Sequence, residues 1–142
     1  MAEIIQRVNP CYCINMKRAT NTLTKYYDEI IKTTGLTISQ FSLLNEIKYL
    51  GICTKGEIAF HAKLDKSTIT RNLKTLHEKG VIQDLSVNDS RESQISLTEL
   101  GQKKIEEGRL LWNKAQKHIL EKVGGEKLKE LEETLKIIEE IR

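Results

Sequence analysis

The sequence predicts a mainly α-helical protein with a minor β component, and three observations support this fold class. Apolar residues recur at steps of three and four over most of the 142 residues, which is the period of amphipathic helices. Glycines divide these stretches into separate helices, at Gly35, Gly51, Gly80 and Gly124. One region, residues 81–97, shows instead the alternation of apolar and polar residues that is typical of strands.

The first three helices are expected in the first half of the chain. A long one runs from about residue 13 to Gly35 and has one broad apolar face. The second begins at Thr37, which forms a capping box with Gln40, and ends at Gly51. A second capping box, in the segment 54–57, opens a short third helix.

A fourth helix follows after a turn of three residues, 63–65. Asp65 is its N-cap candidate, and Gly80 is its stop. Two short helices joined by a tight turn form the core of a helix-turn-helix. Ile69, Leu73 and Leu76 fall on one face of the fourth helix and predict its buried side.

The opposite face of this helix is short, polar and basic. It carries Lys66, Ser67, Thr70, Arg71 and Lys74. The formal net charge of the whole chain is only +3, but six basic residues face three acidic ones between residues 54 and 79. Such a local excess of positive charge is expected of a helix that binds nucleic acid.

A hairpin is expected after the fourth helix. Residues 81–87 alternate, Ile95 and Leu97 share one face of a second strand, and a polar tip with one arginine, Arg91, lies between them. A basic helix fits the major groove of DNA, and an arginine at a hairpin tip can reach the adjacent minor groove. The combination predicts a winged helix-turn-helix over residues 36–98.

Several of these segments resemble one family. Asp89-Ser90-Arg91 followed by Leu97-Thr98 is similar to the D-x-R-x(5)-L-T wing pattern of the MarR family of transcription regulators, and residues 67–71 and 78–82 resemble its recognition-helix signature. The resemblance covers nearly the entire chain. It implies an obligate homodimer that binds short pseudo-palindromic operators in double-stranded DNA.

The flanking helices are expected to form the dimer. A long helix, residues 99–123, follows the cap Thr98, and a final helix repeats leucine and isoleucine at steps of three, four and three: Leu128, Leu131, Leu135 and Ile138. Such a seam predicts a partner helix. We therefore expect residues 1–35 and 99–142 to form a helical dimerisation layer, with Ile4, Ile5 and Val8 contributing from the N-terminal arm.

The residues expected to contact DNA are Lys66, Ser67, Thr68, Thr70, Arg71, Lys74, Ser90 and Arg91. Arg71 is expected to read a base, since arginine to guanine is the commonest specific contact; a solvated arginine or an intrachain ion pair is the alternative. Lys66 and Lys74 are expected to hold phosphates. Asp65 and Asp89 are interpreted as structural, as a helix cap and as a residue that orients the wing.

Three functions are compatible with these features. The first is a regulator, most simply a repressor, that a small molecule releases from DNA. The family resemblance implies an anionic or phenolic effector near helices one, two and five, and Arg18 is the candidate to meet it. The second is regulation by oxidation of Cys11 or Cys13, which point to different faces and cannot easily bond to each other, so that a disulfide across a dimer remains. The third is a winged-helix module that binds protein and no DNA.

Other classes of protein are not expected. The sequence contains no nucleophile elbow, phosphate-binding glycine loop or metal-ligand cluster, so neither an enzyme nor a cofactor is predicted. No apolar run is long enough to span a membrane, and no continuous apolar segment of the signal-peptide type begins the chain. With three cysteines, too few for a disulfide framework, we expect a cytoplasmic protein.

Overall fold

The computed structural model describes residues 9–87 and 92–142. Its helices and strands are α1 (Tyr12–Ile31), the 3-10 turn η1 (Lys32–Thr34), α2 (Ile38–Leu50), α3 (Lys55–Ala62), α4 (Lys66–Glu78), β1 (Ile82–Asp84), β2 (Ile95–Leu97), α5 (Glu99–Val123) and α6 (Gly125–Glu139). The strands β1 and β2 pair antiparallel. The predicted fold class, mainly helical with a small hairpin in a winged helix-turn-helix, is confirmed.

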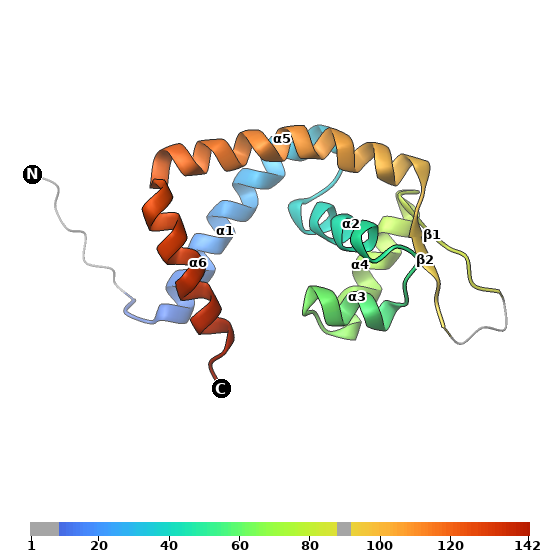
Figure 1. The fold of residues 1–142 in the computed structure, drawn as a ribbon, viewed down its shortest axis with the longest axis horizontal. Helices are drawn as coiled ribbons and strands as arrows, with labels where there is room; N and C mark the ends of the chain where they lie inside the picture. Colours follow the sequence, from blue (N-terminus) through green and yellow to red (C-terminus); the bar gives the residue numbers. More distant parts are fainter. Residues whose placement is uncertain (1–8, 88–91) are drawn as a thin grey trace, which may run out of the picture.

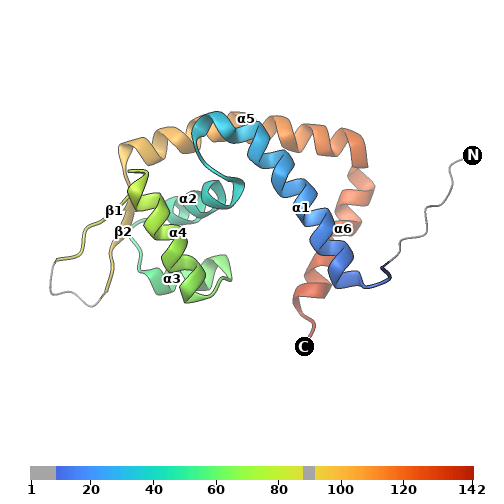
Figure 2. The same cartoon turned by 180° about the vertical axis from the view of Figure 1, so that it is seen from behind.

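Helix α5 connects two differently built parts of the molecule (Figure 1). At one end of α5 lie α1 and α6, whose ribbons cross in both views (Figures 1 and 2). At the other end lie α2, α3, α4 and the hairpin, which we call the winged part. No helix within residues 9–87 and 92–142 is long and apolar enough to cross a membrane.

The winged part closes around one hydrophobic core. This core combines side chains from α2, α3, α4 and the sheet with Ile105 of α5. Two glycines allow α5 to lie close to it: a Cβ on Gly101 would lie 2.1 Å from the carbonyl oxygen of Val81, and one on Gly108 would lie 2.5 Å from the ring of Phe41. The first half of α5 therefore belongs to the same packed unit as the winged part.

Local signals set the helix starts as expected. The Thr37 hydroxyl accepts from the Gln40 N–H at 3.2 Å, and the capping box of α3 forms in the same way. Thr98 caps α5, accepting from the Gly101 N–H at 3.1 Å. One further contact is not local: the Ile38 N–H donates to the Asp28 carboxylate at 2.7 Å, which joins the start of α2 to α1.

The expected alternation over residues 81–87 is wrong. Val81 and Ile82 are both buried, at 2% and 3% exposure, while Leu85 is exposed. The reason is that Val81 still belongs to the end of α4: its N–H donates to the Leu76 carbonyl at 3.3 Å, beyond the left-handed Gly80. The strand therefore begins one residue later and, within the described residues, is short.

A third short segment pairs with the hairpin. The backbone of Cys53, between α2 and α3, exchanges hydrogen bonds with Ile95 at 3.0 and 2.7 Å. The side chain of Cys53 is buried, and burial together with the nearby Glu57 raises the pKa of its thiol. The hairpin is thereby attached to the start of α3.

Candidate nucleic-acid interface

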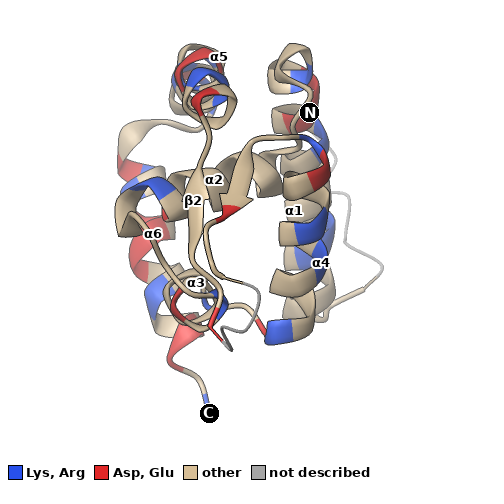
Figure 3. Cartoon of the chain, turned by 90° about the vertical axis from the view of Figure 1, so that its right-hand side faces the viewer, with Lys and Arg blue, Asp and Glu red and all other residues tan. Residues whose placement is uncertain are grey.

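Helix α4 presents one basic side to solvent. Ile69, Leu73 and Leu76 are buried in the core, as the sequence pattern predicted. The opposite side carries the exposed residues Lys66, Ser67, Thr70, Arg71 and Lys74. Figure 3 shows the lysine and arginine positions along the outer side of this helix. The candidate DNA-contacting residues of α4 thus share one accessible surface, with Thr68 partly buried at its edge.

Asp65 caps this helix and also engages two of the candidate residues. Its carboxylate accepts from the Ser67 hydroxyl at 2.7 Å, from the Thr68 N–H at 2.8 Å and from the Thr68 hydroxyl at 3.0 Å. The hydrogen bonds from Ser67 and Thr68 lower the pKa of Asp65 to about 2. Both hydroxyl groups therefore donate within the cap, and each offers its oxygen lone pairs outward.

Two basic residues of this region are engaged elsewhere. The Lys79 ammonium donates to the Gly35 carbonyl at 2.8 Å and to the Gln40 side chain at 2.7 Å, which fastens the end of α4 to the start of α2. Lys63 lies 3.3 Å from the Glu139 carboxylate of α6. The local charge excess counted along the sequence therefore includes lysines that do not lie on the basic side of α4.

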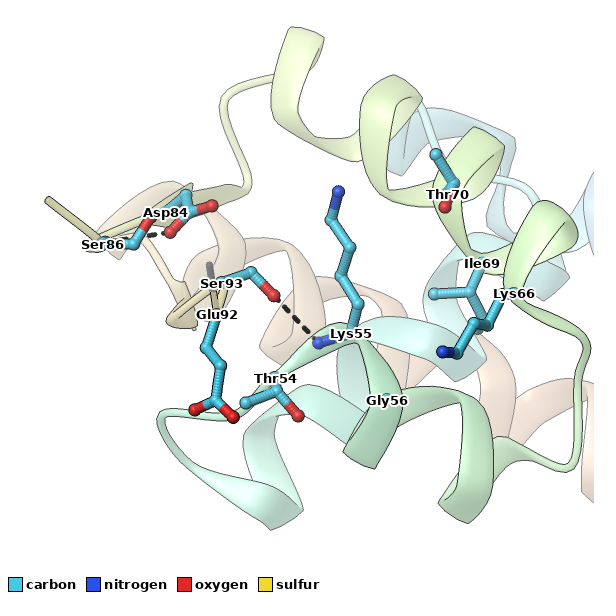
Figure 4. Close-up of a pocket in the computed structure, with 10 residues that line it drawn as sticks. All are labelled: Thr54, Lys55, Gly56, Lys66, Ile69, Thr70, Asp84, Ser86, Glu92 and Ser93. Carbon is cyan, nitrogen blue, oxygen red and sulfur yellow. Dashed lines mark hydrogen bonds between the residues drawn. The ribbon is translucent and has the colours of Figure 1, made fainter. Parts of the chain in front are cut away.

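A groove separates α4 from the hairpin (Figure 4). It consists of two adjoining cavities of about 520 and 300 Å³, and both are lined by Lys55, Thr70 and Asp84. One wall is α4, the other is the hairpin, and the start of α3 lies between them. The Lys55 side chain extends into the space between Asp84 and Thr70 (Figure 4).

The hairpin wall of the groove is held by backbone hydrogen bonds. Oδ1 of Asp84 accepts from the Ser86 N–H at 2.9 Å and from the Gln94 N–H at 3.1 Å. These bonds, with a smaller contribution from Lys55, lower the pKa of Asp84. The Lys55 N–H in turn donates to the Ser93 hydroxyl at 3.0 Å. Sequence reasoning missed Lys55 and Asp84 in this arrangement, because only the fold brings them together.

The tip of the wing lies outside the described residues. Asp89, Ser90 and Arg91 fall between the described ranges 9–87 and 92–142, so their predicted roles remain predictions.

Known proteins resemble this chain over both its winged part and its whole length. The family model described as MarR family matches residues 36–93. The uncharacterized HTH-type transcriptional regulator YwoH of Bacillus subtilis (strain 168) is 32% identical over 92 residues, which are 65% of this chain and 67% of that protein. The chain belongs to the MarR family.

Two further proteins agree with this membership. The HTH-type transcriptional regulator BilQ of Clostridioides difficile (strain CD3) is 25% identical over 118 residues, 82% of this chain and 80% of that protein. The M. tuberculosis transcriptional regulator MosR, solved in complex with DNA, superposes with a TM-score of 0.76 at 28% identity, covering 88% of this chain and 92% of that chain.

As a MarR-family protein, the chain is a DNA-binding transcription regulator and not an enzyme. This finding separates the three functions that the sequence left open. It supports the two that bind DNA and argues against a winged-helix module that binds protein alone.

A second cavity, of about 590 Å³, lies between α2 and α5 of this MarR-family chain. Aromatic side chains contribute much of its lining, from Phe41, Tyr49 and Trp112. Arg18 lies exposed on α1 and is not among the described residues that line the cavity; Arg109 of α5 is the arginine that does. Sequence reasoning missed Arg109, because a single arginine on an amphipathic helix carries no local signal.

The end of α3 forms one edge of this cavity. Nδ1 of His61 lies against the Glu46 carboxylate, and the Tyr49 ring stacks on the His61 ring with centroids 5.1 Å apart. Within the described residues, no group of three or more His, Cys, Asp or Glu side chains is placed to hold a metal ion.

The cysteines of this MarR-family chain differ in accessibility. Cys11 and Cys13 are exposed at the start of α1, and Cys53 is buried. No disulfide joins them, and all three lie in the described part of the chain. Cys13 also lines an apolar cavity of about 560 Å³ together with Met16, Ile138 and Ile141.

Proposed function

We propose that the chain is a homodimeric repressor. Its two winged parts bind a pseudo-palindromic operator, and a small anionic or phenolic molecule releases it from the DNA. The observation that carries this proposal is the exposed basic side of α4, next to a groove and a hairpin, in a MarR-family chain. The proposed reading unit is residues 36–98. The proposed dimerisation layer is residues 1–35 and 99–142.

Open apolar surface supports the dimer. No residue of α6, all of which is described, is buried. Leu131 and Leu135 are 46% and 44% exposed on this helix. Near its end, Ile141 lines an apolar cavity with Tyr12 of α1, and both side chains are more than two-thirds exposed at 72% and 81%. Contiguous apolar surface of this kind marks interaction sites, and a second copy is the proposed occupant.

The proposed contacts to DNA follow from position and charge. Arg71 is proposed to reach a base edge in the major groove, because it is exposed on the basic side one turn beyond Ser67. Lys66 and Lys74 are proposed to hold phosphates. The Thr70 hydroxyl is proposed to accept or donate nearby and the lone pairs of the Ser67 hydroxyl to accept, with Thr68 contributing at the edge. Ser90 and Arg91 are proposed for the minor groove.

The cavity between α2 and α5 is the proposed effector site. Its aromatic lining suits a ring, and the Arg109 guanidinium suits a carboxylate or phenolate. An occupant would contact the winged part through Tyr49 and the long helix through Trp112. The half-sites of an operator lie about one helical turn apart. A small rotation of the winged part against the long helix α5 would therefore move the two α4 helices of the proposed dimer out of register with the half-sites. The ligand must prefer the rotated state.

Binding experiments test the proposal. Purified protein would select bound fragments from the DNA of the source organism, and the selected operator would be titrated at two salt concentrations. Binding that weakens steeply with salt is expected, because lysine and arginine release counterions from phosphates. Aromatic carboxylates and phenols would then be screened for release. An Arg109→Gln variant should still bind the operator. It should be released from the operator only at higher concentrations of the effective compound.

A second candidate is release by thiol oxidation. The exposure of both Cys11 and Cys13 favours it, since a sensor thiol must be accessible. Peroxide should then abolish operator binding by the native chain and leave a Cys11→Ser, Cys13→Ser double variant active. Equal sensitivity of the two proteins would contradict this candidate.

A further inference from the structure

We propose that Lys55 binds the backbone phosphate of DNA in the groove between α4 and the hairpin, where one strand passes from the major to the minor groove. The inference rests on the proposed docking of α4 and the wing. It adds a contact that lies on neither of them, because Lys55 is the first residue of α3.

The groove places Lys55 centrally. Of its two adjoining cavities, one is lined by Lys66 and the other by Lys74, and both are lined by Lys55. Lys66 and Lys74 belong to the α4 wall, so each lies toward one end of the groove. Lys55 rises from α3 between this wall and the hairpin (Figure 4). A chain of phosphates along the groove would meet it near the middle.

The geometry of DNA explains why phosphates should lie there. The major and minor grooves are separated by a single sugar-phosphate strand at each crossing. A protein that inserts a helix into one groove and a hairpin into the next must straddle that strand. The space between α4 and the hairpin is therefore the space that the strand occupies, and Lys55 lies within it.

A cation in the groove would offset the fixed negative charge of Asp84, which lines both cavities. The Asp84 carboxylate lines both cavities and cannot turn away, since its Oδ1 holds the Ser86 and Gln94 N–H groups at 2.9 and 3.1 Å. Its charge would repel a phosphate. The Lys55 ammonium, which extends toward the same space, offsets that repulsion and supplies the attraction (Figure 4).

The test compares two lysine variants. Lys55→Ala should lower operator affinity about tenfold per protomer, the scale of one charge-assisted hydrogen bond. The slope of log affinity against log salt should shrink by about 0.9 per protomer, since one phosphate contact is lost. The loss should be equal on matched and scrambled DNA, because phosphates carry no sequence. Lys48→Ala, which removes an exposed lysine of α2 outside the groove, should change affinity about twofold or less.

Asp84→Asn isolates the role of charge. The amide oxygen can replace Oδ1 as acceptor for both N–H groups, so the hairpin should keep its shape while one negative charge disappears. Added to Lys55→Ala, the Asp84→Asn change should restore about half of the loss in the logarithm of operator affinity. The single variant Lys55→Arg, which keeps the positive charge, should bind like the native chain. Thermal melts check that each variant is folded, and Lys55→Gln replaces Lys55→Ala if the alanine variant is not.

Two outcomes would overturn the inference. One is a Lys55→Ala variant that matches Lys48→Ala in affinity and salt slope. The other is a loss confined to the matched operator, which would make Lys55 a base-reading residue. If the native chain itself binds DNA without salt dependence, the proposed function fails instead, and this result is recognised before any variant is compared.

Discussion

The winged part and the pair formed by α1 and α6 use similar amphipathic helices in different ways. In the winged part, the apolar faces of α2, α3 and α4 meet in one core, where Leu44, Ile58 and Leu76 are fully buried. In α6 no residue of an equally regular apolar stripe is fully buried: Leu128 and Ile138 are half-buried, and Leu131 and Leu135 are exposed. The pattern along the sequence is alike in the two parts. The difference is whether the chain itself supplies the partner surface.

This difference suggests different roles for the two parts of the molecule. A part that closes its own core can hold a rigid reading surface, and it can be tested by substitutions that disturb packing. In the proposed dimer, the part with open apolar surface gains stability from association, so its substitutions should act through concentration and assembly. The four predictions that follow separate these behaviours, beginning with the largest expected effect.

Charge placed on the open stripe should abolish assembly. A Leu131→Glu, Leu135→Glu double variant would place two carboxylates where a second copy is proposed to pack, and operator affinity should fall about 100-fold or more as two linked half-sites become independent. Sedimentation equilibrium and operator titration measure the two effects. Glu133→Lys, an exposed change on the same helix, is the control and should leave the dimer intact. A folded monomer with native affinity would contradict the proposed layer.

Packing between α5 and the turn that joins α4 to β1 should tolerate no added methyl group. A Cβ at position 101 would lie 2.1 Å from the Val81 carbonyl oxygen, so Gly101→Ala should destabilise the fold by about 1–3 kcal/mol. Gly56→Ala is the matched control, because its Cβ would meet nothing closer than 3.8 Å. It should be neutral or stabilising by up to about 1 kcal/mol. Urea unfolding measures both, and equal stabilities would contradict the close approach.

Alanine substitutions of two basic residues of α4 should weaken operator binding in different ways. Arg71→Ala should cost about 1–3 kcal/mol of operator binding and relax the preference at one base pair of each half-site. Lys74→Ala should weaken binding to all sequences alike and reduce the salt slope by about one unit per protomer. Titrations against matched and scrambled operators at two salt concentrations distinguish them. Sequence-independent losses of equal size would show that the reading face is assigned wrongly.

The smallest effect should come from the cap of α4. The folded-state pKa of Asp65, about 2, lies below its ordinary value of 3.8, so the stabilisation is present above the ordinary pKa and is lost as the pH falls through about 2. Asp65→Asn still caps but does not titrate. The stability advantage of the native chain over this variant should therefore shrink between about pH 5 and pH 2. Urea midpoints along this range measure it, and a constant difference would contradict the prediction.

The sequence by itself determined the features that depend on neighbours along the chain. The capping residues Thr37, Asp65 and Thr98 act within one helical turn, and the buried faces of the helices follow from spacing alone. These local signals, together with the wing pattern, were sufficient for the fold class and the family. They were also sufficient to place the basic residues of α4 on one exposed side.

The tertiary structure decided which residues from distant segments meet. It places Lys55 and Asp84 in the same groove. It directs the Lys79 ammonium to the Gly35 carbonyl and not to the basic side of α4. It lines the cavity between α2 and α5 with Arg109, where Arg18 was expected. It also overrode the expected alternation at Val81, because the N–H of this residue donates to the Leu76 carbonyl at the end of α4 and the strand begins only at Ile82. Such pairings depend on how whole elements pack, and no period or motif along the chain encodes them.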